Sequence, residues 1–258
     1  MSQIAAAATF AVFLLVGMLL LLEFGRRCGK IRLAADPQGA RDGLSTVDGA
    51  IFALLGLLTA FTFSGAASRF DSRRALIVEE TNDIGTAWLR LDLLPPEAQP
   101  ALRDSFRKYV DARLEFYRLM PDITAARGAL DRANELQSAI WRQATAATGS
   151  GAAASAPMLL LPALNTMFDI ASTRAATMQF HPPVIIYATL GLVALISSLL
   201  AGFAMAGSRQ RSWIHMAGFA MVTAGAVYVI LDLEYPRLGF IRVDSFDQLL
   251  TDLRQSMN

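Results

Sequence analysis

Side chains that could do chemistry are few in this chain and far apart. The 258 residues include two histidines, His181 and His215, and one cysteine, Cys28. Catalysis needs a nucleophile, a base and their supporting groups in combination, and a single cysteine excludes a disulfide framework or a thiolate metal site. Glu79 and Glu80 are adjacent carboxylates, but neighbours on a helix point about 100° apart and cannot share an acid–base site. We therefore expect no enzyme, no metal and no cofactor.

A cluster of arginines follows a long apolar run. Gly49–Ser68 contains 20 residues without a charge, which is long enough to cross a bilayer, and it leads directly into Arg69 and Arg73. No proline interrupts the chain from this run until Pro95. The sequence therefore predicts one long helix, half in lipid and half in water. The arginines would either anchor the span at the headgroups or attract anions.

Three further apolar runs make four predicted spans in all. Apolar residues form 54% of the chain and charged residues 17%, with a mean hydropathy of +0.40, whereas soluble domains carry roughly 25% charged residues. The first run has no basic residues before it, so we expect a retained helix and not a secretory signal. The predicted spans are Ile4–Leu22, Gly49–Ser68, Pro183–Ala206 and Trp213–Leu231. They pair into two transmembrane hairpins, residues 1–68 and 182–231.

Residues 69–181 read as a helical soluble insert between spans two and three. The insert holds 13 basic and 13 acidic residues, which fits solvated helix faces and gives no basic patch for a nucleic acid. Asp122 is a predicted helix cap, and Asn165, Asp169 and Arg174 are expected to pair with the long helix. Residues 232–258 form a tail with a short amphipathic helix, whose apolar face is Phe246, Leu249, Leu250 and Leu253. The predicted insert helices are Arg69–Leu94, Ala101–Met120, Ile123–Thr148 and Met158–Phe180.

Two stretches of the sequence carry a resemblance to a known family. GLLTAFTFSGAASRFDSRRALIVEETNDIGTAWLRLDLLP and, near the end, DLEYPRLGFIRVD look like the bacterial membrane proteins known as the bestrophin-like domain family. A more distant similarity is to the bestrophin anion channels. In those channels a phenylalanine of the second helix precedes an arginine by eight residues, as Phe61 precedes Arg69. Thr62, Ser64 and the Ala67-Ser68 pair depart from the channel pattern.

The resemblance implies a function and its residues. Bestrophins are pentamers with one axial pore, so it implies a homo-oligomeric, multi-pass protein of the bacterial inner membrane that conducts an anion such as chloride. Position by position, the pore neck would be Phe61, Leu57 and Ala53, which share one helix face, and the pore mouth would be Arg69 and Arg73. The positive edges of phenylalanine rings can favour anions, and an apolar constriction can gate by dewetting.

The same resemblance predicts no calcium site, because Asp232 and Glu234 do not replace the acidic run that binds calcium in animal bestrophins. A second hypothesis is a membrane-anchored sensor or scaffold, whose insert binds a partner and whose spans dimerise through small residues such as Gly56 and Ala60. Membrane orientation stays open. The positive-inside rule places the basic connectors within both hairpins in the cytoplasm, whereas the resemblance places the insert and both termini there.

Overall fold

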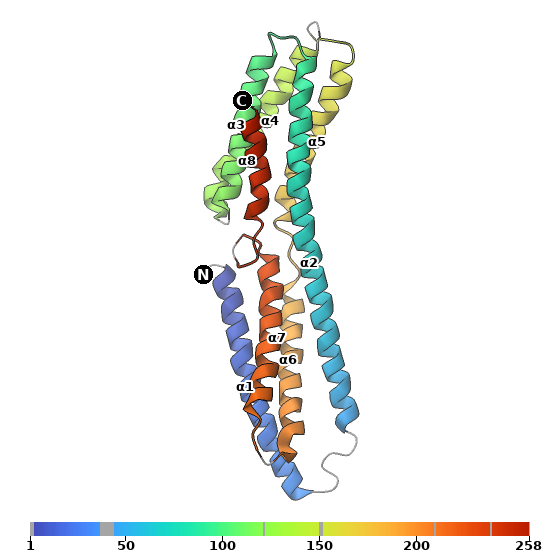
Figure 1. Ribbon diagram of the computed structural model, residues 1–258, viewed down its shortest axis with the longest axis vertical. Coiled ribbons are helices and arrows are strands. Elements are labelled where there is room, and N and C mark those ends of the chain that lie inside the picture. The colour runs from blue at the N-terminus through green and yellow to red at the C-terminus, as the bar shows by residue number, and fades with distance from the viewer. Residues whose placement is uncertain are drawn as a thin grey trace. The chain divides into compact units, whose positions relative to one another are not determined.

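The computed structural model describes residues 3–36, 44–120, 122–149, 152–208, 210–237 and 239–257. These residues form helices joined by short connections, with no strand among them (Figure 1). Short 3-10 turns occupy Leu91–Leu93, Met205–Gly207 and Asp244–Phe246. The α-helices are α1 (Gln3–Ala35), α2 (Leu44–Arg90), α3 (Gln99–Leu119), α4 (Ile123–Gly149), α5 (Ala156–Thr177), α6 (Val184–Ala204), α7 (Trp213–Glu234) and α8 (Asp247–Ser256).

The long helix expected from the sequence is α2, which runs without a break from Leu44 to Arg90 (Figure 1). Its length of 47 residues exceeds what a bilayer needs, which is about 20 residues. The helix tightens into the 3-10 turn Leu91–Leu93 just before Pro95, because the residue before a proline is disfavoured in the helical region. The predicted end at Leu94 was therefore slightly late.

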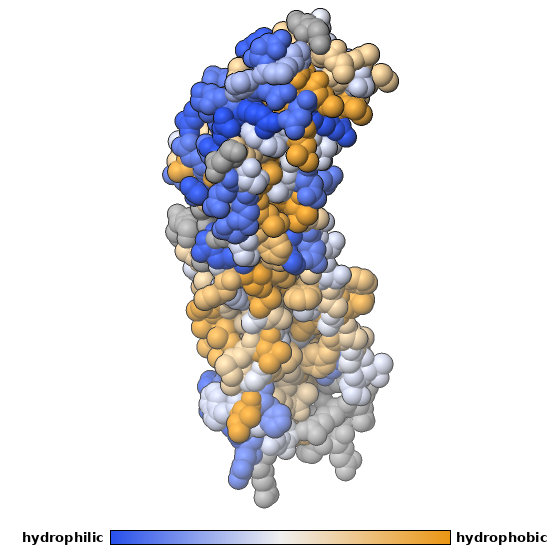
Figure 2. Space-filling view, turned by 45° about the horizontal axis from the view of Figure 1, so that its top comes forward, coloured by the Kyte–Doolittle hydropathy of each residue, from blue (hydrophilic) through white to orange (hydrophobic). Residues whose placement is uncertain are grey.

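Four helices are long and apolar enough to cross a membrane, which agrees with the four predicted spans. They are α1, α2, α6 with the turn that follows it, and α7. The helix that contains the first span is longer than expected: the region after Leu22, predicted as a connector, stays helical to Ala35. An i,i+4 ion pair between Glu23 and Arg27 (3.0 Å) supports this extension. Figure 2 shows hydrophobic residues gathered over the candidate spans.

The chain divides into two compact units. The first unit comprises residues 1–70 and 181–240, and the second comprises residues 71–180 and 241–258. Helix α2 contributes its first part to one unit and its last part to the other. The first unit contains α1, α6 and α7, and the second contains α3, α4, α5 and α8.

In the first unit, α1 packs against α6 and α7, and glycines set the closest approach. A Cβ atom placed on Gly202 of α6 would lie 2.0 Å from the carbonyl oxygen of Leu22, and one on Gly25 of α1 would lie 2.0 Å from the carbonyl oxygen of Leu199. Neither helix can carry a larger side chain there without moving. Small residues at such positions let apolar helices approach closely enough for dispersion contacts.

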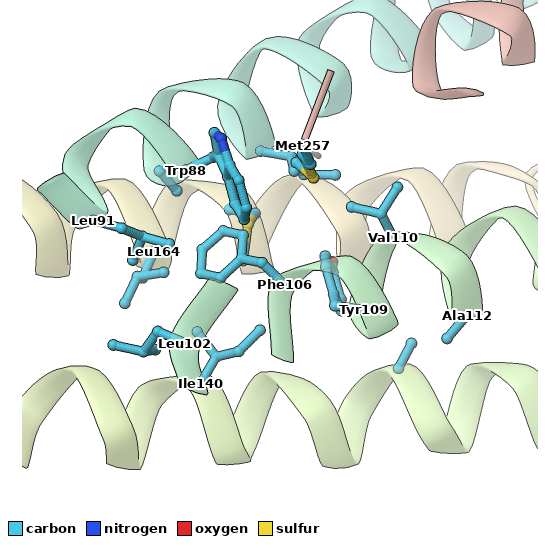
Figure 3. Packing of buried hydrophobic residues seen from close by; sticks show 14 of the residues in the cluster. Trp88, Leu91, Leu102, Phe106, Tyr109, Val110, Ala112, Ile140, Leu164 and Met257 are labelled. Carbon is cyan, nitrogen blue, oxygen red and sulfur yellow. The ribbon is translucent and has the colours of Figure 1, made fainter. Parts of the chain in front are cut away.

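In the second unit, α2, α3, α4 and α5 surround one apolar core. The rings of Trp88 on α2 and Phe106 on α3 lie 6.1 Å apart between centroids, and Leu102 and Ile140 pack beside them (Figure 3). Met257, just after α8, is also fully buried in this core. Side chains of helices that are far apart in sequence thus fill one volume.

The structure also tests two local predictions in the second unit, the cap of α4 and the apolar face of α8. The Asp122 carboxylate accepts hydrogen bonds from the backbone N–H groups of Thr124 and Ala125, both at 3.0 Å, so the predicted cap of α4 is confirmed. Helix α8 buries Leu250 fully, but Leu249, which was predicted on the same apolar face, is exposed. Phe246 and Leu253 are half-buried, so the buried apolar face of α8 is narrower than expected.

Candidate functional site

The three residues predicted for a pore neck lie on one exposed side of α2. Phe61 is 68% exposed and Leu57 is 53% exposed, and Ala53 is exposed two turns before Phe61. Their spacing of four residues keeps them on one side of the helix. An exposed phenylalanine and leucine in an apolar helix need lipid or another subunit to cover them.

Helix α2 is also the candidate span that packs least within its own unit. In the most apolar stretch of each span, the buried share is 11% in α2, compared with 22% in α1, 28% in α6 and 33% in α7. A ring contact between Phe52 and Phe219 of α7, 6.4 Å between centroids, is one of its few anchors. Most of the surface of this part of α2 is therefore available for contact outside the subunit.

Arg69, predicted at the pore mouth, forms an ion pair within the first unit. Its Nε donates to both carboxylate oxygens of Glu234 on α7, at 2.9 and 3.2 Å. The Glu234 side chain is 1% exposed and that of Arg69 is 35% exposed. A side chain larger than glycine at position 65 would meet the Arg69 guanidinium, because a Cβ atom there would lie 3.2 Å from Nη1. Gly65 thus leaves room for Arg69 to reach Glu234.

Arg73, the second predicted mouth residue, is buried within the second unit. Its Nη2 donates to the backbone carbonyl of Phe180 at 3.0 Å, and only 7% of the residue is exposed. Both arginines therefore bind groups of their own subunit. Whether either also acts at a pore mouth stays a prediction.

The tail stretch DLEYPRLGFIRVD contains a buried carboxylate. Asp232, near the end of α7, is 4% exposed and accepts a hydrogen bond from the backbone N–H of Phe240 at 3.2 Å. Gly239 lies so close that a Cβ atom there would overlap Asp232 Oδ1. Asp232 thus binds the backbone of Phe240, and Glu234 binds Arg69. In the described part of the chain, no three His, Cys, Asp or Glu side chains are grouped as metal ligands.

An ion network that is buried except for the partly exposed Asp247 joins four helices of the second unit. Arg113 of α3 donates from Nε to Glu80 Oε1 at 2.6 Å, and the Tyr117 hydroxyl donates to Glu80 Oε2 at 2.9 Å. Arg174 of α5 also pairs with Glu80, and its Nη2 donates to Asp247 of α8 at 2.8 Å. Two guanidinium groups and two carboxylates make the network neutral, which is the condition for burying such charges.

The electrostatics of this network follow from its burial. Burial alone would raise the pKa of the Glu80 carboxyl, but the charges of Arg113 and Arg174 and their hydrogen bonds hold that pKa below its ordinary value. Burial opposes the charge of Arg113, yet Tyr117 and Glu80 raise its pKa. Burial raises the pKa of Tyr109, next to the network, to about 12. Glu80, Arg113 and Arg174 are therefore charged at neutral pH, and the network connects α2, α3, α5 and α8.

Part of this network was foreseeable. Arg174 was expected to pair with the long helix and does so, whereas Asn165 and Asp169, expected to do the same, are exposed. The burial of Glu80 could also have been predicted from the sequence. Glu80 follows Ile77 by three residues and precedes Ile84 by four, which puts it on the apolar face of α2. A charge on an apolar face implies a buried partner.

Two stretches of the sequence resemble a known family. They contain part of the exposed face of α2, both residues of the Arg69–Glu234 pair, and the tail around Asp232. A family model described as "Bestrophin-like domain" matches residues 8–245, almost the whole chain. This chain belongs to the bestrophin-like family. The match includes all four candidate spans, the helices α3 to α5 and the tail around Asp232.

A solved structure has the same bestrophin-like fold. It is the crystal structure of a variant of a bacterial bestrophin homolog from Klebsiella pneumoniae, with a TM-score of 0.67 and 14% sequence identity; the alignment covers 95% of this chain and 97% of that chain. At this identity the likeness concerns the fold alone. No curated protein matches the chain in sequence.

Proposed function

We propose that this bestrophin-like protein is an oligomeric ion channel whose pathway is lined by the exposed face of α2 from several subunits. The observation that carries the proposal is the exposure of α2, which is the least buried candidate span although it is the longest. A helix that offers so little of its apolar surface to its own subunit must be covered from outside it. Membership of the bestrophin-like family supports the choice of a channel.

In this proposal Phe61, Leu57 and Ala53 form the neck. Phe61 and Leu57 supply large apolar side chains one turn apart on the exposed face, and Ala53 leaves a wider ring beyond them. Rings of such residues can close a pathway to ions by excluding water. The resemblance to bestrophins supports the further proposal of a pentamer in a bacterial inner membrane.

Besides the family resemblance, the expectation of an anion had two supports, and the contacts of the arginines weaken one of them. Arg69 is neutralised by Glu234, and Arg73 is buried against the carbonyl of Phe180. The positive ring edges of Phe61 remain as the other support. The charge of the permeant ion thus depends on which groups lie beyond the neck.

The scaffold alternative keeps one specific observation in its favour. Gly56 and Ala60 are exposed beside Leu57 and Phe61, and apart from the adjoining residues of α2 no described atom lies within 4 Å of a Cβ built on Gly56. The same surface would therefore allow two α2 helices to pack closely in a dimer. Oligomer number separates this scaffold from a channel ring.

The test is ion flux through the purified protein in liposomes, with K⁺ and Cl⁻ measured separately. We expect Phe61→Ala to raise flux above the wild type, because it removes the larger apolar ring of the neck. Phe63→Ala is the matched control, since Phe63 is also exposed but lies on the opposite side of α2. If neither the wild type nor Phe61→Ala conducts while both remain folded oligomers, the channel is refuted and a dimer would favour the scaffold.

A further inference from the structure

In the second unit, α2 has an exposed face whose charged residues are all acidic. Its exposed residues from position 71 onward are Asp71, Ser72, Ala75, Val78, Glu79, Asn82, Thr86 and Leu89. Their spacing follows the helical period, so they form one stripe. The stripe contains two acids and no basic residue.

The four arginines of α2 each bind a group of their own subunit, and Arg74 pairs with Asp71 of the stripe. Arg69 pairs with Glu234 and Arg73 binds the Phe180 carbonyl. Arg90 donates to the Leu159 carbonyl at 2.6 Å. Arg74 has its guanidinium 4.3 Å from the centre of the Phe246 ring. Helix α2 contains no lysine. Its positive charges therefore serve contacts within the subunit.

The two acids of the stripe keep their charge exposed. The Asp71 side chain is 68% exposed, and its Oδ1 accepts from Arg74 Nη1 at 3.0 Å. An ion pair so open to solvent is weak, at about 0–1 kcal/mol, and leaves Asp71 accessible to a passing ion. Glu79 is exposed and makes no ion pair with any residue that the structure describes.

A third acid, Asp83, lies beside the stripe. Asp83, one turn after Glu79, has a carboxylate oxygen that is buried and accepts no hydrogen bond from the described residues. Burial raises the pKa of Asp83, and the charges of Glu79 and Glu80 raise it further. Asp83 thus adds a third carboxyl group beside the two acids of the stripe.

We propose that the face of α2 beyond the neck makes the pathway favour cations over anions, with Asp71 and Glu79 as the residues that determine this preference. The inference rests on the proposed function, because only a ring of subunits brings several copies of the stripe around one path. Rings of acidic side chains select cations by raising their local concentration and repelling anions. The neck then sets when ions pass, and the acids set which ions pass.

The test is the ratio of K⁺ to Cl⁻ permeability of the full-length protein in a planar bilayer under a KCl gradient. Where the wild type is closed, the same measurement is made on Phe61→Ala. We expect a ratio above one that falls toward one in the Asp71→Asn, Glu79→Gln variant and falls below one in Asp71→Lys, Glu79→Lys. The ratio should also fall as the salt concentration rises, because ions screen exposed charge.

Matched controls are Asp104→Asn and Glu115→Gln, which remove exposed acids of α3 in the same unit. They should leave the ratio unchanged, whereas a general effect of net charge would move it equally. An anion preference in the wild type, or a cation preference unaltered by the α2 variants, would overturn the inference and leave the channel standing. Absence of any conduction by a folded oligomer would instead refute the channel itself, and the inference with it.

Discussion

Neutralising Glu80 should destabilise the second unit more than any other single change of one charge there. Glu80 is completely buried between Arg113 and Arg174, which are 1% and 2% exposed. The substitution Glu80→Gln keeps the shape of the side chain but leaves two buried guanidinium groups with Asp247 as their remaining acid. Removing one partner of a buried ion pair typically costs about 3–5 kcal/mol. Domains are stable by about 5–15 kcal/mol in total.

A loss of this size corresponds to a fall in melting temperature of roughly 10–20 °C for a unit of this length. The assay is thermal unfolding of the detergent-solubilised protein followed by tryptophan fluorescence, because Trp88 and Trp141 lie in the second unit and Trp88 is in its core. Glu79→Gln is the control, since it makes the same chemical change at the exposed neighbour and should cost less than about 0.5 kcal/mol. Equal melting temperatures for the two variants would refute the reasoning and indicate that water reaches the two arginines.

Two further predictions concern pH and helix packing. Because the pKa of Glu80 is lowered from 4.5 by folding, its stabilisation is complete above about pH 4.5 and is lost as the pH falls through the lower folded value. Urea unfolding at pH 5 to 3 should therefore show a loss of stability that is smaller in Glu80→Gln; equal slopes would contradict this. Gly202→Ala should cost about 1–3 kcal/mol because its Cβ would overlap the Leu22 carbonyl, whereas Gly218→Ala, with open space around it, should melt like the wild type.

The comparison of sequence with structure is clearest along α2. Its continuity from an apolar run into a charged one was predictable, because helix formation depends on neighbours within four residues and on the absence of proline. The spacing of Phe61, Leu57 and Ala53 predicted that they share one side of α2. It did not predict that this side is exposed. Spacing says which residues share a face, but not whether that face meets another helix of the subunit.

The binding partners of Arg69 and Arg73 could not be predicted from the sequence. Arg69 and Arg73 are four residues apart and near the end of a span, which suggested a shared role at a pore mouth. Arg69 instead reaches Glu234, which is 165 residues away in sequence, and Arg73 reaches Phe180, which is 107 residues away. No local pattern encodes such partners, since they depend on how whole helices pack.

By itself the sequence determined the helical content, the four candidate spans, the Asp122 cap and the family. These properties arise from hydropathy, helical period and local hydrogen bonding, which act over a few residues. The tertiary structure alone decided that Glu80 is enclosed by two arginines while Glu79 stays in solvent. It also decided that Arg69 and Arg73 bind distant groups of their own subunit, while Glu79 is exposed without an ion pair in the described chain. The reason is that burial and charge pairing are properties of packed helix faces, and two adjacent residues on one helix can face opposite environments.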